Sequence, residues 1–300
     1  MISFFLTLFI LLFFNFFSLN KKRANNNNCN NYCYKPLFNP KLKIKHVIIT
    51  RFLMHFVPFF IKYMEKEDFS INAKRVLNKY LLPALERQKC KDFIWVLMIG
   101  NQADLSYYKS YFNFNNSFKT ELVYEKDIKN YLKNIINSYD VLITTRIDYD
   151  DVIYYDAVND VRKSININKP IFIHGFNKGY IYFESDGKYY DYDSVFGNNG
   201  VASQFISLVY FINKVNDTYH IYELGDHSTI KSNFLKKYKS FGINDINYNP
   251  CEFDKSIQKF IWIRQKYSGF LIYTNGTRRG LKLINFNSST IYDKCIWSML

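Results

Sequence analysis

Three carboxylates within four positions, Asp148, Asp150 and Asp151, are the residues of this sequence best suited to chemistry. Charges of one sign this close together repel unless a cation or hydrogen-bond donors offset them. Mg²⁺ and Mn²⁺ prefer oxygen ligands and bind through carboxylates together with substrate phosphates. The spacing predicts that Asp148 and Asp150 hold such a cation from one turn, while Asp151 binds it through water, caps the following helix, or does both. The alternative is a solvated turn followed by a helix cap.

The elements that must position these carboxylates follow from the hydrophobic pattern after residue 44. Short apolar runs predict buried strands, and amphipathic runs predict helices. The strands are expected at 47–49, 93–99, 141–144 and 171–173, and the helices at 73–88, at 125–138 and around Val158. This alternation favours an α/β domain with a mainly parallel central sheet flanked by helices. Ligands of such sheets bind beyond the carboxyl ends of the strands, where the run at 141–144 delivers the three carboxylates.

A second Asp-x-Asp pattern, at Asp191 and Asp193, serves as an internal comparison. It lies in a polar, tyrosine-rich stretch between Gly187 and Gly197, which we interpret as a surface hairpin with no buried strand before it. The first cluster is therefore the better candidate.

The segment Thr145–Asp151, followed by an amphipathic helix, resembles the Asp-x-Asp-Asp region of a rhamnosyltransferase family, whose members are glycosyltransferases of the GT-A fold. Further pieces resemble the family in the same order, over roughly residues 44–270: Ile49-Thr50-Arg51-Phe52, Leu82-Pro83-Ala84-Leu85, Asp92-Phe93-Ile94-Trp95, Gly179-Tyr180, Phe205-Ile206-Ser207-Leu208, Tyr222 with Asp226-His227, and Trp262-Ile263-Arg264 with Ser268. The resemblance implies a GT-A-like fold with a Rossmann-like nucleotide-sugar-binding half and an acceptor-side half.

The resemblance also implies roles for individual residues. A cation, Mn²⁺ or Mg²⁺, held by Asp148, Asp150 and Asp151 with His227 as a further ligand, would offset the charge of a departing diphosphate. The implied donor-binding residues are Arg51, Arg146, Asp148, Arg264 and Ser268. Arg146 is expected either to orient the Asp cluster or to form a salt bridge with Asp148.

The catalytic base is open between two carboxylates near His227. Inverting transfer needs a carboxylate that takes the acceptor's proton, and Glu223 and Asp226 are the candidates. The implied function is a metal-dependent glycosyltransferase of the hexosyltransferase type. It would move a sugar, with rhamnose as the family's label, from a nucleotide-sugar to a glycan or lipid-linked acceptor.

The N-terminus predicts a membrane-associated protein with a single-pass anchor. Residues 2–19 are apolar and uncharged, and as a helix they would span about 27 Å. Lys21, Lys22 and Arg23 follow at once. A cleaved signal peptide is the alternative, but the segment lacks a basic start and small residues at its end. The positive-inside rule favours a cytoplasmic domain, whereas a secretory-pathway enzyme needs the opposite orientation. We predict a hydrophobic segment at 1–20, an Asn-rich linker at 21–43 and a catalytic domain at 44–300.

Composition excludes several other classes of protein. The hydrophobic share of 48% in 300 residues is typical of a folded domain. The five cysteines include no Cys-x-x-Cys pair, which excludes a zinc ribbon, and a chain of this length needs no disulfide scaffold. The net charge of +14 would suit nucleic acid, but the lysines are scattered and A/T-rich codon usage explains their number. We expect no nucleic-acid partner. A membrane-tethered binding protein that kept this fold without catalysis is a further alternative.

Overall fold

The computed structural model describes residues 42–52, 67–101, 105–112, 116–176, 178–183, 187–193, 205–225, 229–241, 251–254, 260–264 and 283–284. All of them belong to one compact unit, Cys33–Leu300. The predicted hydrophobic segment 1–20 and nearly all of the predicted linker 21–43 lie outside the described residues. Among the described residues, no helix has both the length and the apolar character needed to cross a bilayer.

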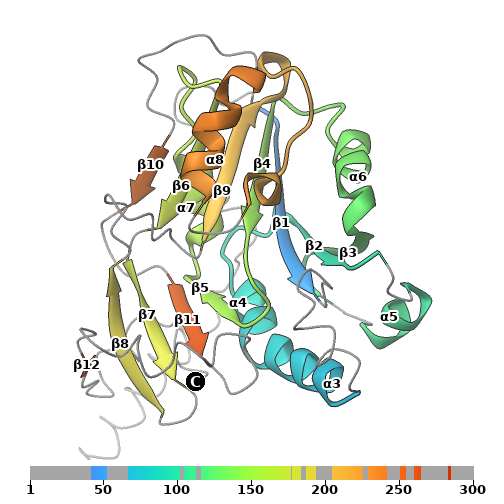
Figure 1. The fold of residues 1–300 in the computed structure, drawn as a ribbon, viewed down its shortest axis with the longest axis vertical. Helices are drawn as coiled ribbons and strands as arrows, with labels where there is room; N and C mark the ends of the chain where they lie inside the picture. Colours follow the sequence, from blue (N-terminus) through green and yellow to red (C-terminus); the bar gives the residue numbers. More distant parts are fainter. Residues whose placement is uncertain are drawn as a thin grey trace, which may run out of the picture. The chain divides into compact units, whose positions relative to one another are not determined.

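A seven-stranded sheet with the order β10-β6-β9-β4-β1-β2-β3 forms the centre of this unit (Figure 1). Its strands are β1 (Ile44–Phe52), β2 (Ile94–Ile99), β3 (Lys119–Tyr124), β4 (Val141–Arg146), β6 (Ile171–Phe176), β9 (Ile206–Phe211) and β10 (Cys251–Asp254). Parallel pairs join β4 to β1, β1 to β2, β2 to β3 and β10 to β6, while β9 is antiparallel to both of its neighbours. The predicted fold class, an α/β domain with a mainly parallel sheet flanked by helices, is confirmed.

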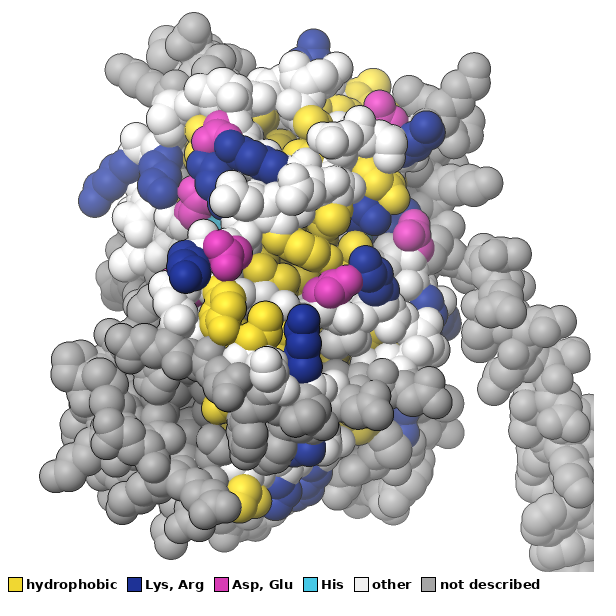
Figure 2. Space-filling model, turned by 90° about the vertical axis from the view of Figure 1, so that its right-hand side faces the viewer, with side chains coloured by type: hydrophobic (Ala, Val, Ile, Leu, Met, Phe, Trp, Pro, Cys, Tyr) yellow, Lys and Arg dark blue, Asp and Glu magenta, His cyan; other side chains and the backbone are white. Residues whose placement is uncertain are grey.

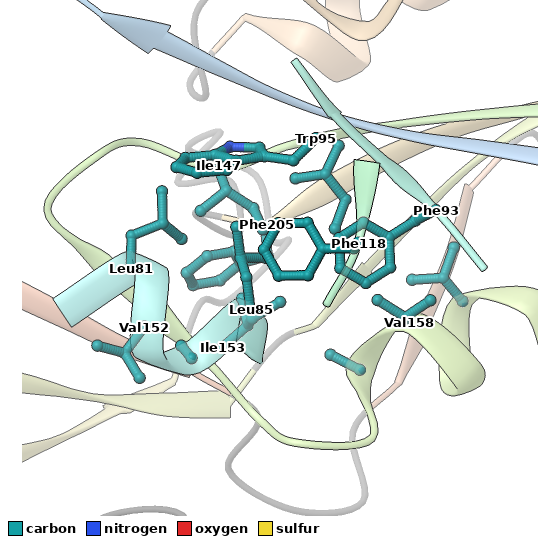
Figure 3. Close-up of a cluster of buried hydrophobic side chains, with 14 of the residues drawn as sticks. Leu81, Leu85, Phe93, Trp95, Phe118, Ile147, Val152, Ile153, Val158 and Phe205 are labelled. Atoms are coloured by element: carbon teal, nitrogen blue, oxygen red, sulfur yellow. The ribbon is translucent and has the colours of Figure 1, made fainter. Parts of the chain in front are cut away.

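Helices cover both faces of the central sheet because its inner strands are apolar on both sides. In β1, Ile44 and Ile48 join one hydrophobic cluster, and Val47 and Ile49 join the other. The first cluster packs against α3 (Glu67–Val76), η1 (Leu77–Leu81), α4 (Leu82–Glu86) and α7 (Ala157–Lys163), and Figure 3 shows its centre around Trp95, Leu85 and Phe205. The second packs against α6 (Ile128–Ile135), η4 (Ile221–Leu224) and α8 (Ile230–Lys237).

The predicted helix at 73–88 is present but contains a π-helical turn, η1, between α3 and α4. Leu82 N–H donates to Leu77 C=O across this turn. Pro83 follows directly and has no N–H to donate to the preceding turn, and its ring would clash with the carbonyl four residues back. A wider turn just before the proline avoids that clash, so the proline explains the irregularity.

A second sheet, β12-β8-β7-β11-β5, begins in the sequence at Asp151, the last residue of the Asp cluster. Its strands are β5 (Asp151–Ile153), β7 (Lys178–Phe183), β8 (Lys188–Asp193), β11 (Phe260–Arg264) and β12 (Leu283–Ile284). The chain leaves the central sheet at Arg146 and enters the second sheet at Asp151. The residues between them therefore form the crossing from one sheet to the other.

The second Asp-x-Asp pattern lies in β8, the second strand of a hairpin. β7 and β8 form an antiparallel hairpin whose turn contains Gly187 at φ +66°, and Asp191 and Asp193 belong to β8. The expectation that no buried strand precedes this pattern is wrong, because β7 buries Ile181 and Phe183. Tyrosines alternate with these two residues along β7. The segment therefore reads as polar in the sequence, although one face of the strand is apolar.

One cysteine of the core is oxidised. Cys90 lies between α4 and β2, has 1% of its surface exposed, and takes part in a disulfide bond. This bond adds to the stability of a domain whose hydrophobic clusters are already extensive.

Candidate functional site

The carboxyl ends of β1 and β4 lie side by side at the point where the strand order reverses. β1 is followed by β2 and β3 on one side of it, and the chain then returns to add β4 on the other side. In open α/β sheets this switch point leaves a crevice beyond the strand ends, where ligands bind. The register pairs Ile49 with Arg146, so that Arg51 extends two residues further toward the edge.

One face of these two strands carries the polar side chains of the site. Side chains alternate along a strand, so Thr144 and Arg146 of β4 point to the same side of the sheet. Ile49 of β1 faces the second cluster, and Arg51 follows it with the same period. η4 packs on this face of the sheet. It thereby brings a segment from far along the chain to the carboxyl ends of β1 and β4.

Arg146 is a buried cation with three neighbours at this edge. Its side chain is 2% exposed, and its Nη2 lies 3.5 Å from Oδ2 of Asp148, whose side chain is 27% exposed. Its Nη1 donates to Gly225 C=O at 3.2 Å. The predicted salt bridge between Arg146 and Asp148 is therefore present. A buried guanidinium needs such partners, because desolvation of an unpaired charge costs several kcal/mol.

Tyr222, the second residue of η4, contacts both arginines. The guanidinium carbons of Arg51 and Arg146 each lie 4.8 Å from the centroid of its ring, within cation–π range. Its hydroxyl donates to Ile49 C=O at 3.3 Å and lies 3.5 Å from Oδ1 of Asp148. Burial and the nearby Asp148 carboxylate raise the pKa of Tyr222, so the phenol stays protonated.

The segment that carries Tyr222 is anchored on both sides of it. Ile221 N–H donates to the Thr144 hydroxyl at 3.0 Å, and the Asn233 side chain donates to Leu224 C=O at 2.9 Å. Gly225 ends η4 with φ +86° and ψ −153°, a conformation confined almost entirely to glycine. A Cβ there would lie 2.7 Å from Nδ2 of Asn233, so the Asn233 side chain would have to shift to admit it.

The predicted Asp cluster forms a turn in which its members differ in burial. Asp151 N–H donates to Asp148 C=O at 3.2 Å, Asp148 and Asp150 are partly exposed, and Asp151 is buried with 1% exposed. The prediction that Asp151 caps the next helix is wrong. β5 intervenes, and the N-cap position of α7 belongs to Asp156. Burial and the three carboxylates raise the pKa of Tyr149, which keeps it neutral.

The carboxylates alone do not complete a metal centre. Among the described residues, no group of three or more His, Cys, Asp or Glu side chains could hold a metal ion. Asp148 and Asp150 are both partly exposed, so a cation could reach their carboxylates from solvent. His227, the predicted further ligand, lies outside the described residues, so metal binding stays a prediction.

The two candidate bases have different outcomes. The carboxylate of Glu223 accepts a hydrogen bond from His220 N–H at 3.2 Å and so caps the start of η4. Burial raises its pKa, and the His220 N–H and the nearby Lys129 and Lys237 work against that shift. Among the described residues, this carboxylate thus contacts the capping turn. Asp226 lies outside the described residues, so the identity of the base stays a prediction.

The structure does not describe the side chains of the other two predicted donor-binding residues, Arg264 and Ser268. Arg264 ends β11, which pairs with β5 and β7, and Ser268 lies outside the described residues. Glu125, which directly follows β3, was not predicted as a site residue. Partial burial raises its pKa, and the positive charge of Arg51 works against that shift.

The structural role of Tyr222 is not visible in the sequence. The residue belongs to the resembling pattern, but it is one of 26 tyrosines and nothing in its spacing connects it with Arg51 or Arg146. The glycine three positions later is the available signal, because a glycine directly after a short helix often marks a special backbone conformation.

Comparisons with known proteins give distant similarities. No family model matches the chain, and no curated protein matches it. Among solved structures it is similar to residues 1–349 of TarS from S. aureus, with 14% identity over 73% of this chain and a TM-score of 0.37. It is similar also to a longer TarS structure (14%, 74%, 0.36) and to the inositol-1-phosphate CTP transferase from T. maritima (8%, 75%, 0.35). The alignments cover 60%, 37% and 90% of those three chains.

Proposed function

We propose that this protein is a glycosyltransferase that binds a nucleotide-sugar at the carboxyl ends of β1 and β4. The observation that carries the proposal is the convergence of Arg51, Arg146 and Asp148 around Tyr222 where the strand order reverses. Such crevices bind nucleotides in open α/β sheets. A cationic edge suits the diphosphate that joins nucleoside and sugar. The family resemblance supports the same ligand.

The chemistry asked of the site is stabilisation of a leaving group. When the bond between sugar and diphosphate breaks, negative charge grows on the departing oxygens, and cations fixed in advance lower that barrier. Arg51 is partly exposed and can contact this charge directly. The buried Arg146 acts indirectly, because its ion pair with Asp148 holds that carboxylate in position. Asp226 or Glu223 would take the proton of the acceptor hydroxyl, which belongs to a glycan or a lipid-linked sugar.

A divalent cation, Mn²⁺ or Mg²⁺, is part of the proposal. Asp148 and Asp150 would hold it from their partly exposed turn, together with His227, and when bound it would supply positive charge to the diphosphate. Asp151 supports that turn through its main-chain N–H, which donates to Asp148 C=O. Rhamnose is the sugar that the family resemblance suggests.

A nucleic-acid-binding role has weaker support. Several lysines and arginines of the described residues are engaged with carboxylates: Lys129 and Lys133 with Asp217, Lys119 with Glu121, Lys91 with Glu86, and Arg162 with Asp92. Figure 2 shows one face of the molecule, on which basic and acidic side chains are interspersed around apolar ones. A phosphate backbone would instead require a continuous basic stripe.

The proposed location is a membrane-tethered domain in an oxidising compartment. The predicted anchor at 1–20 would provide the tether. The disulfide at Cys90 supports the orientation that places the domain away from the cytosol, since disulfides persist where thiols are not kept reduced.

A thermal-shift screen of nucleotide-sugars with Mn²⁺ or with EDTA tests this function. We expect one donor to raise the melting temperature in a cation-dependent way, as ligands that bind only the folded state do. Asp148→Asn and Asp150→Asn should abolish both this shift and release of the nucleoside diphosphate. Asp191→Asn, in the other Asp-x-Asp pattern, is the matched control and should change neither.

Three results would redirect the proposal. A wild-type protein that no donor stabilises would contradict the transferase. Stabilisation by a donor that is never turned over, with any glycan or lipid-linked acceptor, would favour the non-catalytic binding protein. Salt-sensitive oligonucleotide binding that survives Asp148→Asn would favour the nucleic-acid role.

A further inference from the structure

We propose that Tyr222 is a positioning residue that holds the Arg51 guanidinium for an anionic ligand. This inference rests on the proposed function, in which the ligand's diphosphate lies at the ends of β1 and β4. It adds a residue from η4, far along the chain, to a site otherwise built by the strand ends.

Electrostatics gives the ring a purpose at this position. Arg51 and Arg146 bring two positive charges to one edge, each 4.8 Å from the same ring centroid. Like charges repel one another. An aromatic ring has no net charge, but the negative electrostatic potential of its π-face attracts both guanidinium groups. Asp148 adds a full negative charge on the Arg146 side, where Nη2 and Oδ2 lie 3.5 Å apart.

The two arginines differ in what they can reach. Arg146 is almost fully buried and already bonded to Gly225 C=O, so it cannot contact a ligand directly. Arg51 is partly exposed and lies two residues closer to the edge in the register. An incoming anion would therefore meet Arg51. The ring of Tyr222 would set the direction of its guanidinium.

The ring is fixed before any ligand arrives. The Tyr222 hydroxyl donates a hydrogen bond to Ile49 C=O. On either side of Tyr222, Ile221 N–H donates to the Thr144 hydroxyl, and Leu224 C=O accepts from the Asn233 side chain. Holding a long arginine side chain in one orientation in advance removes an entropic cost from binding. The expected benefit of Tyr222 is thus tighter binding of the diphosphate through Arg51.

Isothermal titration with inorganic pyrophosphate measures this benefit. Arg51→Gln should raise the Kd at least about 10-fold, and Tyr222→Leu should raise it about 5- to 10-fold, as expected for a partly desolvated cation–π contact. Tyr222→Phe keeps the ring and the hydrogen bonds that anchor Ile221 and Leu224, and should stay within about 3-fold of wild type. Tyr139→Leu removes a ring that contacts Lys45 at 4.3 Å at the amino end of β4, and serves as the matched control with unchanged Kd.

A double variant separates positioning from a merely structural role. If Tyr222 acts through Arg51, Arg51→Gln combined with Tyr222→Leu should bind pyrophosphate no more weakly than Arg51→Gln alone. Additive losses would overturn the inference. Should Tyr222→Leu fail to fold, phenylalanines with increasing fluorine content at position 222 keep the shape and weaken the π-face. Affinity should then fall with each fluorine.

The inference and the proposed function can fail separately. Wild-type affinity for pyrophosphate in Tyr222→Leu, or no affinity in the wild type, overturns the positioning role whatever the donor screen finds. A donor screen without any stabilised complex overturns the proposed function and, with it, the inference.

Discussion

The hydroxyl of Tyr222 donates to the main-chain carbonyl of Ile49, 3.3 Å away and 173 positions earlier in the chain. The bond ties η4 to the carboxyl end of β1. Because Arg51 and Arg146 both contact the Tyr222 ring, the positions of their guanidinium groups depend on the position of η4.

Gly225→Ala should disturb this arrangement. The residue has φ +86° and ψ −153°, and an added Cβ would meet Asn233 Nδ2 at 2.7 Å and Thr229 Oγ1 at 2.8 Å. We expect a loss of about 2 kcal/mol or more in the free energy of unfolding, measured with urea. Gly187→Ala is the control. Its φ of +66° is also unfavourable, but a Cβ there meets nothing within 4 Å, so only about 1 kcal/mol should be lost. Equal losses in the two variants would contradict the packing argument.

Asp148→Asn should lower both stability and donor binding. The substitution leaves the buried Arg146 without its counter-ion, which should cost about 1–3 kcal/mol because Asp148 is partly exposed. Asp92→Asn breaks a comparable pair with the buried Arg162, whose Nη2 lies 2.8 Å from Asp92 Oδ2, before the start of β2 and so at the other end of the strands. This control should lose stability and keep the donor-induced thermal shift. A shift that is lost in both variants would point to global instability instead.

Stability should rise with pH between about 4 and 6.5. Burial, with Lys129 and Lys237 nearby, lowers the pKa of His220 from 6.5 to about 4. In this window the unfolded chain binds a proton that the folded chain does not, so acid favours unfolding, by up to about 3 kcal/mol. Burial also lowers the pKa of His46, which acts in the same direction, whereas the raised pKa of Glu223 acts in the opposite one.

Urea unfolding at several pH values checks this prediction, with His220→Asn as the informative variant. Asparagine keeps a favoured N-cap side chain at the start of η4 but cannot titrate. The variant should therefore lose part of the pH dependence between 4 and 6.5. Identical slopes in both proteins would show that the histidine does not control it.

Cys90 should be protected from alkylation until the protein is reduced. The residue is disulfide-bonded and buried, so maleimide should label it in denaturant only after a reductant is added. Cys90→Ala should lower the free energy of unfolding by about 2–4 kcal/mol. Labelling of Cys90 without reductant, in protein taken from its native compartment, would contradict both the bond and the proposed oxidising location.

The sequence by itself determined the local elements and the main candidate residues. Runs such as Val47-Ile48-Ile49 and Val141-Leu142-Ile143 are apolar at every position, as expected of short strands buried on both faces. Their alternation with amphipathic segments predicted the mainly parallel sheet. It also placed Arg51 and Asp148 at the carboxyl ends of two predicted strands. In parallel strands these ends lie at one edge of the sheet, so the two residues were expected at the same edge.

Tertiary structure alone decided which of these residues meet. The antiparallel position of β9 and the insertion of β5 before α7 depend on pairing between strands that are distant in the sequence. Local periodicity carries no information about such pairing. Tyr222 reaches Arg51 and Arg146 only because η4 packs on the face of the sheet from which those side chains project. Its chemistry at position 222 is that of any buried tyrosine, and the long-range packing of η4 sets its neighbours.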